Sequence, residues 1–157
     1  MRDFFEDLKE RILISDGAMG TMLYQAGVDP MACYEYQNIL NPALVSDIHN
    51  QYIQAGADII ETNSFGANAV KLSRYGIDKE VIRINKEAAL IAKNCAKDKV
   101  YVAGSIGPVS GHDLSEKEVY VIFKEQLQGL LDGGIDLIIL ETFTNLEHIR
   151  TALDLCK

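Results

Sequence analysis

Cysteine, histidine and proline are scarce in this chain, which has three of each among its 157 residues. The cysteines, Cys33, Cys95 and Cys156, are odd in number, widely spaced and without a C-x-x-C pair. This pattern argues against a disulfide framework and against a zinc site built from this chain alone. The few prolines and the absence of a low-complexity tract leave no linker, so we expect one domain over residues 1–157.

Long apolar runs and basic clusters are also missing. The longest apolar stretches fall far short of a membrane span, and residues 1–14 alternate charged and bulky side chains where a signal peptide would have an apolar core. The net charge is −8, and the fifteen basic residues are scattered along the sequence. We therefore expect no nucleic acid partner, no membrane partner and a cytoplasmic location.

The sequence instead alternates two periodicities. Continuously apolar strands separated by long amphipathic helices predict parallel strands that are covered by helices. A short leading helix is expected at residues 1–11. Strands are then predicted at 11–16, 57–62, 100–105 and 135–142, and helices at 41–56, 78–97, 114–134 and 145–157.

The chain repeats itself, because "AGADIIETNSF" recurs later as "GGIDLIILETF". The strand–helix units recur about every 40 residues, which is the spacing of a (β/α)₈ barrel. The predicted fold class is therefore α/β, with four parallel βα units forming the N-terminal half of a (β/α)₈ TIM barrel. A doubly wound sheet is the alternative, but "DGAMGT" at 16–21 lacks the glycine spacing of a dinucleotide-binding turn.

Acidic residues end three of the predicted strands: Asp16, Glu61 and Glu141. In an α/β barrel the chemistry lies at these carboxyl ends, so the acids would meet at one mouth if Ile12, Ile14 and Asp16 share an inward face. Asp16 could instead cap the turn that follows it, Glu141 could bond to a neighbouring loop amide, and Glu61 could be paired with an internal basic residue. Acids at corresponding ends of several strands favour a ligand that carries an ammonium group or another cation.

Four ordered segments carry a more specific signal: "SDGAMGTMLYQAG", "GADIIETNSFGAN", "AGSIGP" and "LIILETFTN". In this order and at these spacings they resemble the homocysteine S-methyltransferase family, and the homocysteine-binding barrel of its cobalamin-dependent members in particular. The resemblance runs from about Ile12 to the last residue.

The resemblance implies a barrel in which zinc binds the thiol of homocysteine as a thiolate, which then takes a methyl group to give methionine. By motif, Asp16 and Glu141 resemble the acids that hold the homocysteine ammonium group. The backbone of Gly17 and the side chains of Thr62 and Phe65 resemble the loop residues that position the amino-acid end of the substrate.

The resemblance also places the family's zinc cysteines beyond residue 157, one after the sixth strand and an adjacent pair at the eighth. Cys33, Cys95 and Cys156 match none of them, so zinc is not expected in this chain and the isolated chain is expected to be inactive. The methyl donor, whether methylcobalamin, a folate, betaine or a sulfonium compound, stays open.

Two functions from different classes follow. The first is the homocysteine-binding part of a methyltransferase, and the second is a non-catalytic half-barrel that serves assembly or binds a small ligand. Half a barrel would leave two sheet edges and an apolar inner face uncovered. The expected partners are therefore homocysteine, together with either a second copy of the chain or the missing C-terminal half of the barrel.

Overall fold

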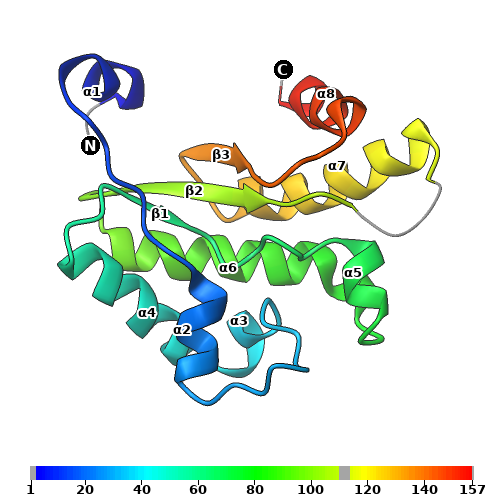
Figure 1. Ribbon diagram of the computed structural model, residues 1–157, viewed down its shortest axis with the longest axis horizontal. Helices are drawn as coiled ribbons and strands as arrows, with labels where there is room; N and C mark the ends of the chain where they lie inside the picture. Colours follow the sequence, from blue (N-terminus) through cyan, green and yellow to red (C-terminus); the bar gives the residue numbers. More distant parts are fainter. Residues whose placement is uncertain (1–2, 110–113, 157) are drawn as a thin grey trace.

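The computed structural model describes residues 3–109 and 114–156, which form one parallel sheet with helices on both of its faces (Figure 1). The elements follow one another as α1 (Phe4–Glu10), α2 (Met19–Gln25), α3 (Gln37–Leu40), α4 (Pro42–Gln54), β1 (Ile59–Glu61), α5 (Ala69–Ser73), the 3₁₀ turn η1 (Asp78–Glu80), α6 (Val81–Ala96), β2 (Tyr101–Ile106), α7 (Glu116–Asp132), β3 (Leu137–Leu140) and α8 (Leu146–Leu155).

The sheet has three strands in the order β1-β2-β3, and both neighbouring pairs are parallel. These strands confirm the predictions at 57–62, 100–105 and 135–142. Parallel neighbours need a long crossover connection, which α6 and α7 provide. The carboxyl ends of all three strands consequently point to the same edge of the sheet.

The prediction of a strand at residues 11–16, the first of the four, was wrong. This segment runs beside β1 but makes only one parallel bridge, between Ser15 and Ile59. Its backbone–backbone hydrogen bonds lie near this bridge: Asp16 N–H donates to the Ile59 carbonyl, and the Ile14 carbonyl accepts from the N–H groups of Asp58 and Ile59. Ile12 and Ile14 are 88% and 60% exposed, so apolar packing does not extend the pairing. Three strands, and not four complete βα units, are therefore observed.

The predicted short leading helix is confirmed as α1, and the four predicted longer helices are confirmed as α4, α6, α7 and α8. Ser115 and Glu118 form the capping box of α7. Helices α2, α3 and α5 were not predicted, because they have only seven, four and five residues and show little of the 3.6-residue period. Within the described ranges, no helix is both long and apolar enough to cross a membrane.

The two faces of the sheet pack against different layers. Ile60 and Val102 point to one face, where they contact the alanines of α6. Ile59, Tyr101 and Ala103 point to the opposite face, where Leu13 packs with them. The inward side of residues 11–16 is therefore that of Leu13 and Ser15, so the expected inward orientation of Ile12 and Ile14 was wrong.

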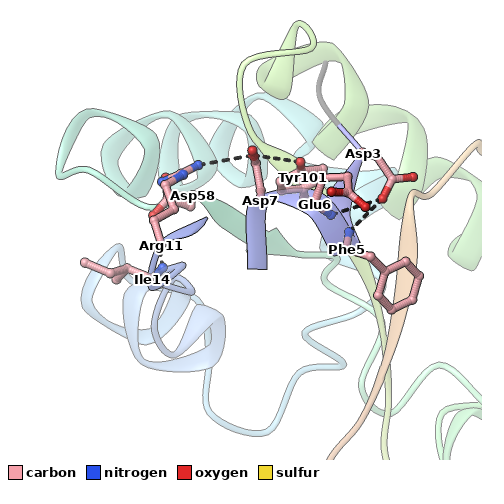
Figure 2. A network of polar contacts seen from close by, with 8 residues as sticks. All are labelled: Asp3, Phe5, Glu6, Asp7, Arg11, Ile14, Asp58 and Tyr101. Atoms are coloured by element: carbon pink, nitrogen blue, oxygen red, sulfur yellow. Dashed lines mark hydrogen bonds and ion pairs between the residues drawn. The ribbon is translucent and has the colours of Figure 1, made fainter. Parts of the chain in front are cut away.

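Helix α1 covers this second face at the amino ends of the strands. The ring of Phe4 packs edge-on against Tyr101, with centroids 5.2 Å apart. The Tyr101 hydroxyl donates to Asp7 across 2.9 Å, and Arg11 joins Asp7 to Asp58 with N···O distances of 3.5 and 2.6 Å (Figure 2). This network ties the leading helix to β1 and β2 at the end of the sheet opposite to the strands' carboxyl ends.

Candidate functional site

A cavity of about 510 Å³ lies at the carboxyl ends of the strands, within the usual size range of small-molecule sites. The structure places all five of the predicted site residues in its lining, although they come from three separate parts of the chain. They are Asp16, Gly17, Thr62, Phe65 and Glu141. Their proximity follows from the parallel sheet, which brings the ends of successive strands together.

Hydroxyl and carboxyl side chains alternate across the sheet at this edge. Ser15 Oγ donates to Glu61 Oε1 across 3.2 Å, and Ser105 Oγ donates to Glu141 Oε1 in a short hydrogen bond. Period-two alternation explains the arrangement, because Glu61 lies two residues after Ile59 on the same face. The apolar face described above thus ends in a polar row that borders the cavity.

Asp16 ends the pairing of residues 11–16 with β1. Its Oδ2 accepts a hydrogen bond of 3.0 Å from the backbone N–H of Glu61, which lowers its pKa. Burial raises the pKa more strongly, the nearby charge of Glu61 raises it further, and the outcome is a pKa of about 7. Near neutral pH, Asp16 is consequently poised between its charged and neutral forms.

Glu61 ends a predicted strand, as Asp16 and Glu141 do, and it also lines the cavity. Burial raises its pKa first, the charge of Glu141 raises it further, and the bond from Ser15 opposes both effects. A buried carboxyl group whose pKa is raised by a neighbouring carboxylate favours a shared proton or a bound cation.

The lining of the cavity is acidic. Glu35 adds a fourth carboxyl group to Asp16, Glu61 and Glu141, and among the described lining residues there is no lysine or arginine. Such a site favours the binding of a cation, because a positively charged ligand removes the mutual repulsion of the acids.

Gly17 follows Asp16 and is constrained by Tyr52 of α4. A Cβ atom at Gly17 would lie 3.0 Å from the Tyr52 hydroxyl oxygen. That hydroxyl donates to the Ala18 carbonyl across 3.3 Å, which fixes the turn between residues 11–16 and α2. A larger residue at position 17 would therefore need the Tyr52 side chain to move by a few tenths of an ångström.

The loop after β1 supplies Thr62 and Phe65. The Thr62 hydroxyl is buried, lies 2.6 Å from Ser64 Oγ and accepts from Ser105 N–H across 3.1 Å, so it holds the loop to β2. The Phe65 ring lies beneath the Lys71 ammonium group, with 4.2 Å from nitrogen to centroid. Gly107 leaves room for this ring, since a Cβ atom there would lie 2.4 Å from it.

Sequence reasoning missed two cavity residues that carry chemistry or strain. Glu35 lies in a turn before α3 and outside any periodic pattern, so no strand-end signal marked it. Thr142 has a φ of +57°, a left-handed conformation that is uncommon for a β-branched residue. Such strain accumulates at functional sites, and here it turns the chain immediately after Glu141.

The cysteines do not converge on the cavity. The Cys33 thiol donates to Glu35, and burial raises its pKa to about 12. Cys95 pairs with Ser46, and Cys156 with the Ala152 carbonyl. Over residues 3–109 and 114–156, no group of three or more histidine, cysteine or acidic residues could hold a metal ion.

A parallel α/β sheet with a polar cavity at the carboxyl ends of its strands defines a class of ligand-binding α/β domains, many of them enzymes. Within this class, the chain belongs to the homocysteine S-methyltransferase family, whose sequence model matches residues 13–157.

Two mycobacterial proteins are similar over nearly the whole chain. The methionine synthases of Mycobacterium leprae and Mycobacterium tuberculosis are each 34% identical to it over 169 aligned positions. Each alignment covers 96% of this chain but 14% of the relative. The chain therefore spans about one-seventh of the length of these curated relatives.

Solved structures of the homocysteine methyltransferase MmuM from Escherichia coli have a similar fold. The metallated form superposes with a TM-score of 0.84 at 23% identity, covering 94% of this chain and 60% of that one. The oxidised form gives a TM-score of 0.87 at 24% identity, with 99% and 61% covered. The three-stranded sheet thus corresponds to part of a larger domain in those proteins.

Proposed function

We propose that this chain is the homocysteine-binding part of a methyltransferase that transfers a methyl group to the homocysteine thiol and so makes methionine. The observation that carries the proposal is the convergence of Asp16, Glu61 and Glu141 on one cavity in a chain of this family. The relatives are longer than this chain, so the activity belongs to the whole protein.

The acids account for recognition of the amino-acid end of the substrate. Homocysteine brings an ammonium group. The cavity brings carboxyl groups, two of which, Asp16 and Glu61, have pKa values raised by burial and by a neighbouring carboxylate. An ammonium group between Asp16 and Glu141 would favour the ionised form of Asp16 and would form charge-assisted hydrogen bonds with both carboxyl groups. The donors Ser15 and Ser105 would keep the carboxyl groups of Glu61 and Glu141 in place during binding.

Zinc would supply a thiolate at neutral pH in the complete family barrel. The residues described here do not fit that role, because no group of them could hold the metal and the Cys33 thiol is kept protonated. We therefore assign to this chain the binding and orientation of the substrate. Metal ligands and the methyl donor are expected from the remainder of the enzyme.

We further propose that the three strands, with residues 11–16 beside β1, form the first half of a (β/α)₈ barrel. Two observations support this: the parallel order β1-β2-β3, and the likeness to chains of which this one covers about 60%. The second half would pair with the outer edge of β3 and with residues 11–16.

The proposal can be tested by measuring methionine formation. The assay uses the full-length protein that contains this chain, with a methyl donor supplied. Asp16→Asn and Glu141→Gln should each raise the KM for homocysteine at least about tenfold, because each removes one charged partner of the ammonium group. Asp47→Asn is the matched control, since Asp47 is exposed on α4 and does not line the cavity. Unchanged kinetics in both cavity variants would refute the proposed role.

A further inference from the structure

The loop that follows β1, residues 62–68, forms one wall of the cavity. Thr62, Asn63, Ser64 and Phe65 all line it. The loop has no sheet partner for most of its carbonyl groups, yet much of it is buried. Buried carbonyl groups need hydrogen-bond donors, so whatever supplies these donors also determines where the wall lies.

Backbone N–H groups donate to several of these carbonyl groups, including that of Ser64, which accepts from Ala67 N–H across 2.9 Å. Side-chain amides from three separate helices add donors that tie the loop to the rest of the fold. Each amide is nearly or fully buried, with at most 2% of its residue exposed. The bonds run from Asn38 of α3 to the Asn63 carbonyl at 2.8 Å, from Asn85 of α6 to the Ala67 carbonyl at 2.7 Å, and from Gln126 of α7 to the Ser64 carbonyl at 2.7 Å.

Gln126 is the most informative of the three. It lies on the buried face of α7, among the apolar side chains of Ile122, Phe123 and Leu130. Its Oε1 atom has no hydrogen-bond partner among the described residues, so the amide is only half satisfied. Burial of a half-satisfied amide costs more than burial of leucine or methionine. The contribution that distinguishes glutamine here is its bond to Ser64.

We propose that Gln126, together with Asn38 and Asn85, is a positioning residue that holds loop 62–68 in its ligand-receiving shape before the ligand arrives. Phe65 lies between the anchored carbonyl groups of Ser64 and Ala67, and its own carbonyl accepts from Gly107 N–H across 3.0 Å. A wall fixed in this way spares the ligand the entropy cost of ordering it. The proposal rests on the proposed function only for the identity of the ligand, homocysteine.

Fluorine NMR tests the role without any ligand. The chain has five phenylalanines, which can be labelled with 4-fluorophenylalanine, and Phe65→Leu assigns the Phe65 resonance. Gln126→Met keeps the length of the side chain and removes the donor. We expect one narrow Phe65 resonance in the wild type, and a broadened, split or shifted one in Gln126→Met. Ile122→Val, which trims the core around the same helix, should leave the resonance unchanged.

An unchanged Phe65 resonance in Gln126→Met would overturn the proposal, as would an equal change in Ile122→Val. If Gln126→Met does not fold, Asn38→Leu removes a second donor to the loop. The Phe65 resonance of that variant is then read by the same criteria.

Titration with L-homocysteine is the second readout. The dissociation constant should rise between about 10-fold and 100-fold in Gln126→Met, the scale expected when a binding wall is displaced. An unchanged constant would also overturn the positioning role. If the wild type itself does not bind homocysteine, the proposed function fails, while the ligand-free spectra still decide whether Gln126 positions the loop.

Discussion

The backbone N–H of Glu61 donates to the Asp16 carboxylate across 3.0 Å, although 45 residues separate the two in the sequence. The bond joins residues 11–16 to β1 at the carboxyl end of the sheet. The same neighbour acts on Asp16 in two ways, because its N–H lowers the pKa of Asp16 and its charge raises it. Burial decides the balance, and the site therefore changes its charge close to neutral pH.

Asp16 should make the protein less stable as the pH rises. Its folded-state pKa of about 7 exceeds the ordinary value of 3.8, so the folded state binds more protons between these two pH values. Stability from this group is present below about pH 4 and is lost as the pH rises to about 7. Relative to Asp16→Asn, the wild type should lose about 1–3 kcal/mol between pH 4 and pH 8, measured by urea unfolding. A difference that does not vary with pH would contradict the assignment.

Removal of the Glu61 charge should lower the pKa of Asp16. Glu61→Gln keeps the backbone N–H that donates to Asp16 and deletes only the carboxylate that repels its charge. A carbon-13 NMR titration of the side-chain carboxyl groups should then give Asp16 a pKa below about 7. Asp47→Asn, on the exposed face of α4, serves as the control. A pKa that stays the same or rises in Glu61→Gln would show that the two carboxyl groups do not interact.

His49 should have the opposite effect on stability. It is fully buried in α4, and burial lowers its pKa from 6.5 to about 4. The folded state therefore binds fewer protons between these values, so stability present above about pH 6.5 is lost as the pH falls to about 4. Relative to His49→Leu, the wild type should lose up to about 3 kcal/mol over this window. Equal pH dependence in the two proteins would mean that His49 ionises without penalty in the fold.

The exposed edge of the sheet should promote association of the isolated chain. Ile12 and Ile14 are exposed beside β1, and all four residues of β3 are only half-buried. Exposed edges with apolar side chains recruit other strands or a second copy of the chain. Light scattering on dilute protein should give a mass above that of one chain, and Ile14→Lys should lower it. A stable monomer in both cases would contradict the half-barrel proposal.

The sequence predicted the parts of the fold that rest on long patterns. The 16-residue α6 and the 17-residue α7 carry a clear amphipathic period, and each apolar strand that follows them was found. Residues 11–16 show the limit of such patterns. Six residues do not reveal whether Leu13 or Ile12 packs inward, because that depends on the neighbour available on each side.

Some residues of the site could likewise be predicted from the sequence, and others could not. Asp16 and Glu141 could be predicted, because parallel strands place their carboxyl ends together. Glu35 and Gln126 could not, since each reaches the site through a contact between elements distant in the sequence. Gln126 bonds to a residue 62 positions away, and nothing in its local sequence marks that partner.

Calorimetric titration tests most directly whether the acidic cavity binds the ammonium group of homocysteine. L-homocysteine and 4-mercaptobutanoate share the thiol and the carboxylate, and only the first carries the ammonium group. We predict that L-homocysteine binds at least about tenfold more tightly, and that Asp16→Asn and Glu141→Gln each abolish this preference. Binding near pH 6 should also release a proton, since an ammonium group beside Asp16 lowers a pKa of about 7. Equal affinity for the two compounds, or an undiminished preference in both variants, would contradict the account.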